Sequence, residues 1–110
     1  MCVLVLVTQP TKETSLMIGA NRDEFRQRPS AAPAILEKGI MGGKDLEAGG
    51  TWLGMNREGL FVAITNRSNP LPTQGSPSRG KLVMEALRTA TLEEAQTRIE
   101  TLLKSHPHAG

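Results

Sequence analysis

Cysteine and aromatic residues are scarce in this sequence of 110 residues, and no block of like charges is present. The chain has one cysteine, one tryptophan, two phenylalanines and no tyrosine. A single cysteine allows no internal disulfide, and with His106 and His108 alone it forms no metal-ligand cluster. So few aromatic side chains, without a basic run, argue against a nucleic-acid-binding module.

Long hydrophobic runs are also missing. The apolar segment 3–7 has no basic segment before it and meets the polar residues 8–12 at once, so it predicts neither a secretory signal nor a membrane span. The net charge of +2 arises from 13 basic and 11 acidic residues spread along the chain. The missing signal and the single cysteine favour the cytoplasm. We expect one domain, because 110 residues are enough for one small core and too few for two.

The one cysteine directly follows Met1, so removal of Met1 makes Cys2 the N-terminal residue. An α-amino group with a pKa of about 8 and a thiol with a pKa of about 8.5 can exchange a proton near neutral pH without a histidine. This chemistry is that of the N-terminal-nucleophile hydrolases. The alternative is that Cys2 is a small apolar residue that opens a strand.

The predicted elements are strands followed by helices. The apolar runs 3–8 and 16–20, with a turn signal between them, predict a hairpin whose first strand is covered on both faces. Two prolines predict an irregular segment at 29–33, and 56–59 reads as a turn between short strands. The apolar period then becomes helical over 82–87 and over 92–103, where Thr91 and Glu94 form a capping box. This order favours an α+β fold with antiparallel sheets and two C-terminal helices.

Four blocks in chain order carry a resemblance to a known family. They are Met1-Cys2, the tetrad Asn21-Arg22-Asp23-Glu24, the glycine-rich block 43–54 and the pair Thr65-Asn66. Together they resemble the NRDE family, which includes proteins like transport and Golgi organisation protein 2. The resemblance runs from Met1 to Arg88 and implies an αββα sandwich of the N-terminal-nucleophile type. Family members are longer, so residues 1–110 are expected to be a single partial domain, the N-terminal half of such a sandwich.

A second likeness concerns the candidate catalytic residues. The segment from Met55 to Asn66 resembles the stretch that ends in the oxyanion-hole asparagine of bile salt hydrolases and penicillin V acylases. The likeness implies that the residues at the matching positions of this chain have the same roles as in those enzymes. Cys2 would be the nucleophile, Asp23 would bind the α-amino group and Asn66 would donate to the oxyanion. Those acylases have an arginine three residues before the aspartate, where this chain has Ala20. Arg22 is the nearest arginine and is the fourth candidate catalytic residue.

The NRDE resemblance also marks ligand-binding candidates, which are Asn21 and Glu24 from the tetrad and Trp52 as a wall of the cleft. The alternatives stay open: the tetrad can be a charged cluster at a strand end, with Arg22 and Asp23 paired in a solvated turn, and Trp52 can belong to the core. Asp45 and Glu47 are expected to be solvated surface charges. We expect neither a metal nor a cofactor.

The expected function is hydrolysis of non-peptide carbon–nitrogen amide bonds by Cys2. The competing expectation is an N-terminal-nucleophile scaffold that binds or transfers a small ligand, such as haem or an acyl-coenzyme A, without hydrolysing it. A third is a fragment that needs its missing half. In each case the partner is a small molecule, with no nucleic acid and no membrane span. A partial sandwich leaves an apolar face exposed, so self-association is also expected.

Overall fold

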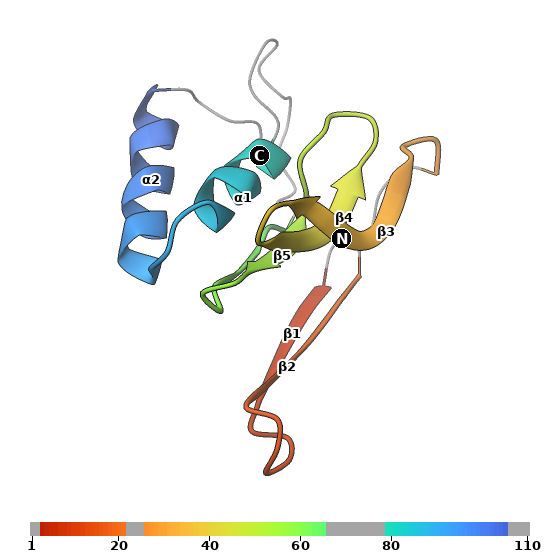
Figure 1. Ribbon diagram of the computed structural model, residues 1–110. Helices are drawn as coiled ribbons and strands as arrows, with labels where there is room; N and C mark the ends of the chain where they lie inside the picture. The colour runs from red at the N-terminus through yellow and green to blue at the C-terminus, as the bar shows by residue number, and fades with distance from the viewer. Residues whose placement is uncertain (1–2, 22–25, 66–78, 106–110) are drawn as a thin grey trace.

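The computed structural model describes residues 3–21, 26–65 and 79–105, which form an α+β fold (Figure 1). Its strands make two antiparallel sheets, one of two strands and one of four, and two helices follow them in the chain. This arrangement confirms the predicted class of antiparallel sheets with two C-terminal helices. Within the described ranges, no helix is both long enough and apolar enough to cross a membrane.

The first sheet is the predicted hairpin, made of β1 (Val3–Thr8) and β2 (Leu16–Asn21). The strands are antiparallel, and Val3 at the start of β1 is the partner of Asn21 at the end of β2. The β-branched residues of the first strand favour this extended conformation. The open end of the hairpin therefore lies where the chain enters β1 and leaves β2.

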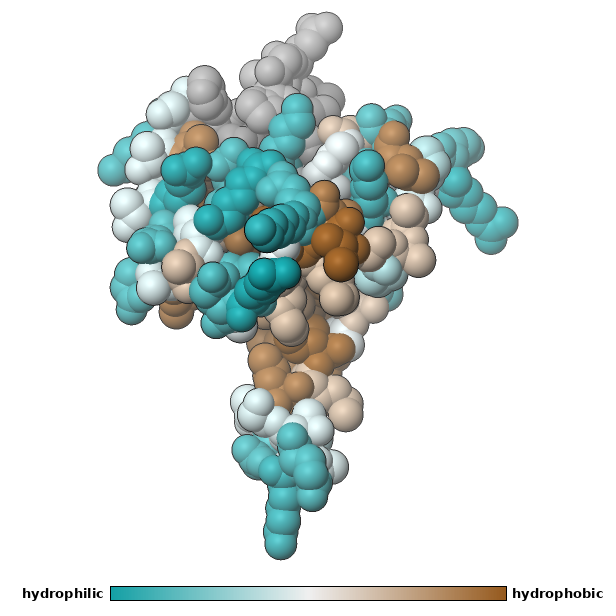
Figure 2. Space-filling view, in the orientation of Figure 1, coloured by the Kyte–Doolittle hydropathy of each residue, from teal (hydrophilic) through white to brown (hydrophobic). Residues whose placement is uncertain are grey.

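The hairpin extends away from the larger sheet (Figure 1), and its apolar side chains are exposed (Figure 2). The exposed residues are Val3, Val5, Leu6, Val7, Leu16 and Met17. The predicted burial of the first strand on both faces is therefore wrong for the described chain. A sheet of two strands needs another element to cover its faces, and no element in the described ranges packs on it.

The second sheet is a meander of four strands in the order β3-β4-β5-β6. The strands are β3 (Ser30–Glu37), β4 (Ile40–Asp45), β5 (Leu53–Asn56) and β6 (Phe61–Ala63). Gly59 has φ 84° and closes the turn between β5 and β6, as predicted for residues 56–59. Its positive φ favours glycine there because other residues meet a steric penalty.

The strand β3 includes a segment that was predicted to be irregular. Pro33 lies inside β3, where the register with β4 breaks between Ala31 and Ala34. Because β3 is at the edge of its sheet, a proline at such a break removes no necessary ladder hydrogen bond. The expected irregular segment at 29–33 is therefore wrong for Ser30 and Ala31, which pair with Asp45 and Lys44, whereas Pro33 has no partner in the register.

Two helices follow the sheet, α1 (Arg79–Leu87) and α2 (Leu92–Ser105), and they match the predicted helical periods. The amide of Glu94 donates to Thr91 Oγ1 at 3.2 Å. The carboxylate of Glu94 accepts from the amide of Ala90 at 3.0 Å. These contacts satisfy backbone donors that a helix start leaves free, so the predicted cap of α2 is confirmed.

The core lies between α1 and one face of the four-stranded sheet. Its buried members are Ile40, Val83, Met84 and Leu87, with Leu36, Val62 and Ile64 packed against them. The helix α2 packs on α1 rather than on the sheet (Figure 1). The described chain therefore has one helical layer on one side of one sheet.

A buried amide side chain joins the sheet to the end of α1. Asn56 is only 7% exposed, and its Nδ2 donates to the carbonyls of Leu87 at 3.0 Å and Thr89 at 2.7 Å. Its Oδ1 accepts from the amides of Glu58 at 3.1 Å and Leu60 at 3.0 Å. One side chain thus satisfies the last carbonyl of α1, a carbonyl just after the helix, and two amides of a turn.

Candidate functional site

Most of the predicted site residues lie outside the described ranges. These are Cys2, Arg22, Asp23, Glu24 and Asn66. The structure describes two of the candidates, Asn21 and Trp52, and both segments that flank the tetrad. The described geometry of the site is therefore that of the residues on either side of these candidates.

The tetrad begins at Asn21, which is also the last residue of β2. The amide of Val3 donates to Asn21 Oδ1 at 2.8 Å, and the two residues are also partners in the hairpin register. Asn21 is exposed, so its side chain fixes the open end of the hairpin from the solvent side. In the described chain, the predicted ligand-binding residue Asn21 thus orients the backbone of Val3.

The flank after the tetrad is fixed by an ion pair. Arg28 Nη2 lies 2.6 Å from Asp45 Oδ2, and Arg28 Nε also contacts the carboxylate of Glu47 at 3.1 Å. Next to this pair, the amide of Leu46 donates to the carbonyl of Pro29 at 3.0 Å. Residues 28 and 29 are therefore attached to the turn that follows β4.

Asp45 itself is 7% exposed, so the prediction that it is a solvated surface charge is wrong. Its second oxygen, Oδ1, accepts from the amides of Glu47 at 3.0 Å and Ala48 at 3.2 Å. Burial raises the pKa of Asp45, but the hydrogen bonds from Arg28 and from these two amides outweigh it. The pKa of this carboxyl therefore lies below its usual range, and the folded protein favours the charged form.

The turn after β4 packs directly against the start of α1. Gly50 has φ 81°, and a Cβ at this position would lie 2.6 Å from the carbonyl carbon of Gly80. The amide of Thr51, which is 1% exposed, reaches the carbonyl of Gly80 at 3.4 Å. Gly50 and Gly80 thus allow the turn after β4 and the start of α1 to approach closely.

Trp52 is half-buried, and its ring lies against β4. A Cβ on Gly43 would come within 2.5 Å of the six-membered part of this ring. The carbonyl of Trp52 accepts from the amide of Ile64 at 3.0 Å. The indole therefore covers Gly43 beside the sheet, and it does not line the groove between β3 and α1.

An open groove of about 470 Å³ runs between β3 and α1. Its walls include Ala31, Ala34, Leu36 and Met84, and Lys44 and Lys81 also line it. Neither lysine has an ion-pair partner among the described residues. The groove therefore combines an apolar wall with two cations available to an anionic group.

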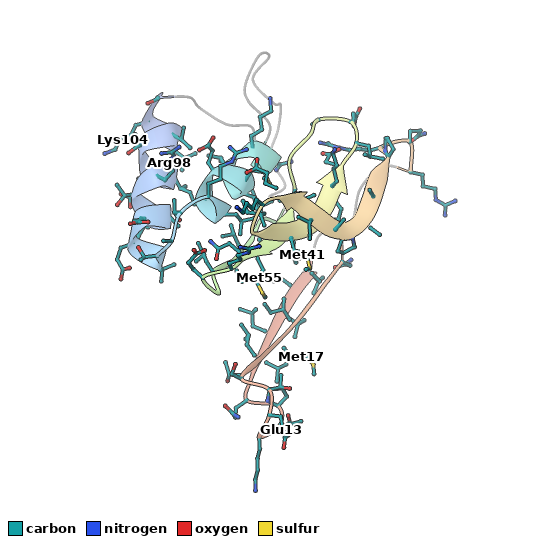
Figure 3. The ribbon with its side chains drawn as sticks, in the orientation of Figure 1. Glu13, Met17, Met41, Met55, Arg98 and Lys104 are labelled. Atoms are coloured by element: carbon teal, nitrogen blue, oxygen red, sulfur yellow. The ribbon has the colours of Figure 1, made fainter. Side chains whose placement is uncertain are left out.

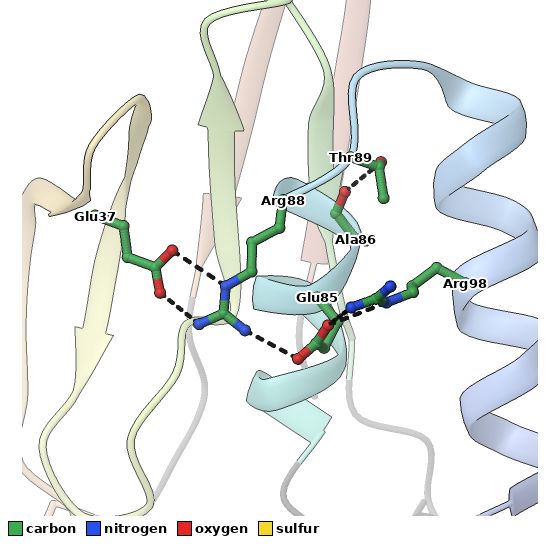
Figure 4. A network of polar contacts seen from close by, with 6 residues as sticks. All are labelled: Glu37, Glu85, Ala86, Arg88, Thr89 and Arg98. Carbon is green, nitrogen blue, oxygen red and sulfur yellow. Dashed lines mark hydrogen bonds and ion pairs between the residues drawn. The ribbon is translucent and has the colours of Figure 1, made fainter.

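Charged residues connect β3, α1 and α2 beside this groove (Figure 4). Arg88 pairs with Glu37 and also with Glu85, at 2.9 Å, and Arg98 contacts the other oxygen of Glu85 at 2.8 Å. The hydrogen bond from Arg88 lowers the pKa of Glu37, and the same contact raises the pKa of Arg88. The arginines thus pair with both carboxylates beside the groove. Lys44 and Lys81 are the charged lining residues that have no ion-pair partner in the described part of the chain.

Among the described residues, no group of three or more histidine, cysteine, aspartate or glutamate side chains could hold a metal ion. The ion pair between Arg28 and Asp45 is the feature that the sequence reasoning missed. Asp45 lies in the glycine-rich block and Arg28 shortly after the tetrad, but nothing local in the sequence indicates that they meet.

Comparison with known proteins gives a consistent result. The family model for Transport and Golgi organisation 2 matches residues 1–109. The chain is similar to the Transport and Golgi organization protein 2 homolog of Bos taurus, with 33% identity over 96 residues, which is 79% of this chain and 35% of that protein. It is 35% identical over 98 residues to the Homo sapiens homolog, covering 81% of this chain and 36% of that protein. The chain thus spans about a third of the length of these relatives. No solved structure matches it.

Proposed function

The chain belongs to the Transport and Golgi organisation 2 family, and from this premise we propose that it carries the nucleophile region of an N-terminal cysteine amidohydrolase. The proposed substrates are small molecules with a non-peptide carbon–nitrogen amide bond. Cys2, exposed as the N-terminus after removal of Met1, supplies both the thiol and the base.

One observation carries this proposal, the contact between Val3 and Asn21. Cys2 is joined to Val3 and Arg22 is joined to Asn21, and these two described residues are register partners with a hydrogen bond of 2.8 Å. The described residues next to Cys2 and next to Arg22 therefore lie at the same end of the hairpin, which supports the proposal. The ion pair between Arg28 and Asp45 supports the proposal further, because it attaches the other flank of the tetrad to the sheet.

The proposed reaction follows from the residue types. The α-amino group takes the proton of the Cys2 thiol, and the thiolate forms a bond to the amide carbonyl carbon. Asn66 donates to the oxyanion of the tetrahedral intermediate, and Asp23 orients the α-amino group. The carbon–nitrogen bond then breaks, and the leaving amine takes the proton from the α-ammonium. Water hydrolyses the remaining thioester, which releases the acid and the free thiol.

The test is amine release from acyl 4-nitroanilides of graded acyl length. Cys2→Ala should abolish turnover, and Asn66→Ala should lower it by about 100-fold because one oxyanion donor is lost. The matched control is the same chain with Met1 retained, which keeps the thiol but moves the free amine away from it. Turnover by the Met1-retained chain at the full rate would contradict the proposal.

The groove favours a second candidate function, binding of an amphipathic anion such as an acyl-coenzyme A or haem without hydrolysis. Lys44 and Lys81 would contact the anionic groups, and the apolar wall would contact the hydrocarbon part. Equilibrium binding of an acyl-coenzyme A should then weaken in Lys81→Glu and stay unchanged in Cys2→Ser. Under the hydrolase proposal the pattern of sensitivity is reversed, so the two variants separate the functions.

A further inference from the structure

The groove between β3 and α1 is hollow because the residues on its sheet side are small. Ala31, Ala32 and Ala34 line it on β3, and Met84 lines it on α1. An alanine side chain is a single methyl group, so three of them leave open the space that larger residues fill in a close-packed core. The volume of about 470 Å³ lies within the range of small-molecule sites, which is about 300 to about 1000 Å³.

The two lysines of the groove lie at the same end of it. Lys44 is the register partner of Ala31, near the start of β3. The amide of Asp45 donates to the carbonyl of Gly50 at 3.1 Å, and a Cβ on Gly50 would lie 3.0 Å from the amide nitrogen of Lys81. The start of β3, the turn after β4 and the start of α1 therefore meet here. We call the part of the groove lined by Lys44 and Lys81 the cationic end.

Ion pairs span the opposite end of the groove (Figure 4). Arg88, which directly follows α1, pairs with Glu37 at the end of β3 and with Glu85 at 2.9 Å. The other oxygen of Glu85 contacts Arg98 at 2.8 Å. We call Glu37, Arg88 and Glu85 the polar bridge. An apolar chain that passed the bridge would take these charged groups out of water, which costs free energy.

The cationic end suits a doubly charged head group. Lys44 and Lys81 have no ion-pair partner among the described residues, and the first turn of α1 contains no acidic residue. A phosphate monoester carries a charge of about −1.5 to −2 at pH 7, which matches two ammonium groups, whereas a carboxylate carries one charge. Between the lysines and the bridge, Leu36 and the flexible side chain of Met84 offer an apolar wall to a hydrocarbon chain.

We propose that the groove binds a phosphate monoester of a short hydrocarbon chain in one direction, with the phosphate at the cationic end and the end of the chain at the polar bridge. This inference rests on the second candidate function, anion binding in the groove, and adds the head group, the direction and a limit on chain length. A helix rises about 10 Å from residue 81 to residue 88, at about 1.5 Å per residue. The groove therefore accepts a chain about as long as an octyl group.

Calorimetric titration of the 110-residue chain with butyl, hexyl, octyl and dodecyl phosphate tests the limit. Affinity should rise about fourfold per added methylene up to the octyl compound, because burial of one methylene contributes that factor. It should then level off, since further methylenes stay in water. An octyl carboxylate should bind more weakly than octyl phosphate. Equal or tighter binding of the carboxylate would overturn the assigned head group.

Lys81→Met tests the direction, because it removes the charge and keeps an apolar side chain. It should weaken binding by about tenfold at every chain length and leave the rise per methylene unchanged. Lys104→Met is the matched control, because Lys104 lies on α2 and does not line the groove (Figure 3). It should bind as wild type does. A smaller rise per methylene in Lys81→Met, with unchanged binding of butyl phosphate, would overturn the direction.

Arg88→Leu tests the polar bridge, because it replaces the bridging cation with an apolar side chain. Dodecyl phosphate should then bind at least about tenfold more tightly than it binds to wild type, and octyl phosphate should be unaffected. Arg98→Leu is the matched control, because Arg98 also pairs with Glu85 but does not line the groove (Figure 3). Exposed ion pairs contribute little to stability, so both variants should fold.

Two results separate this inference from the function on which it rests. Binding that keeps rising beyond the octyl compound, or that does not respond to Arg88→Leu, would overturn the inference and leave anion binding in place. Absence of binding by every phosphate would overturn both.

Discussion

Asp45 is the residue on which the described part of the site depends most. Its carboxylate contacts Arg28 and the amides of Glu47 and Ala48. Asp45→Asn removes the charge and should lower the free energy of unfolding by about 2 kcal/mol, since hydrogen bonds to a buried charge contribute that much. Urea unfolding measures the change. Glu47→Gln is the control, because this exposed side chain contacts the same arginine and should change stability by less than about 1 kcal/mol.

The same substitution predicts a pH dependence. The pKa of Asp45 is lower in the folded state than in the unfolded state, so the unfolded chain takes up this proton first as the pH falls. The contribution of Asp45 to stability is therefore complete above its unfolded pKa of about 3.9 and is lost as the pH falls through the lower folded value. The stability difference between wild type and Asp45→Asn should shrink below about pH 4. A difference that stays constant into acid would contradict this account.

Alanine substitutions at two neighbouring glycines distinguish the cost of backbone strain from the cost of steric overlap. Gly49 has φ 75° and no atom within 4 Å of a built Cβ, whereas Gly50 has φ 81° and would place that atom 2.6 Å from Gly80. Gly49→Ala should therefore lower stability by about 1 kcal/mol, the penalty of the left-handed region alone. Gly50→Ala should lower it by about 3 kcal/mol because the start of α1 must also move. Equal losses in thermal unfolding would show that the two backbones are not in close contact.

Asn21 is proposed to act through Val3 rather than through substrate. Asn21→Ala removes the 2.8 Å hydrogen bond at the open end of the hairpin and should slow alkylation of Cys2, with a loss of stability below about 1 kcal/mol. Thr11→Ala is the control, because it removes a similar exposed contact to the amide of Thr14 at the other end of the hairpin. If both variants react at the same rate as wild type, Asn21 does not position the nucleophile.

At the scale of elements, Asn56 joins the end of β5 to the end of α1. Asn56→Ala leaves the carbonyls of Leu87 and Thr89 and two turn amides without this partner, so stability should fall by about 3 kcal/mol. Asn56→Asp keeps the acceptor for the turn but turns a carboxylate oxygen toward the carbonyls of Leu87 and Thr89, which repel it. In this variant, amide hydrogen exchange should show a loss of protection in α1 and retained protection in the turn. Uniform loss of protection in both elements would contradict this division.

The elements that were predictable from the sequence are those with local signals. The hairpin, the turn at Gly59 and the cap at Thr91 each depend on residues within a few positions of one another. The prediction of an irregular segment was wrong at Ser30 and Ala31, because their partners in β4 are distant in the chain. It was wrong at Asp45, because its partner Arg28 is 17 positions away.

At the scale of the whole molecule, the exposed apolar surface is the main departure from a self-sufficient domain. The hairpin has no covering layer in the described ranges, and the four-stranded sheet has helices on one face only. Sequence alone predicted that a partial sandwich exposes an apolar face, but not which face. That assignment needs the register, which places Ile35, Met41, Met55 and Phe61 in one row.

The family was predictable from the sequence, whereas the arrangement around the candidate site was not. The blocks that resemble the family pointed to Cys2 and to the tetrad; the match over residues 1–109 confirms the family, and the roles of these residues stay predictions. The sequence did not reveal that both flanks of the tetrad are anchored, because each anchor joins residues that are distant in the chain. The chain spans about a third of the length of these relatives. The proposed nucleophile, Cys2, lies within this part, so the first test of the proposed activity is made there.

The most direct test is intact-mass spectrometry of the purified chain after brief alkylation at pH values from about 5 to about 9. An activated N-terminal nucleophile predicts loss of Met1 and rapid labelling of Cys2 well below pH 8, where the same chain unfolded in urea reacts slowly. Because Cys2 is the one cysteine, every added mass reports on it. Retained Met1, or a folded chain whose thiol follows the same pH profile as the unfolded chain, would contradict the proposed function.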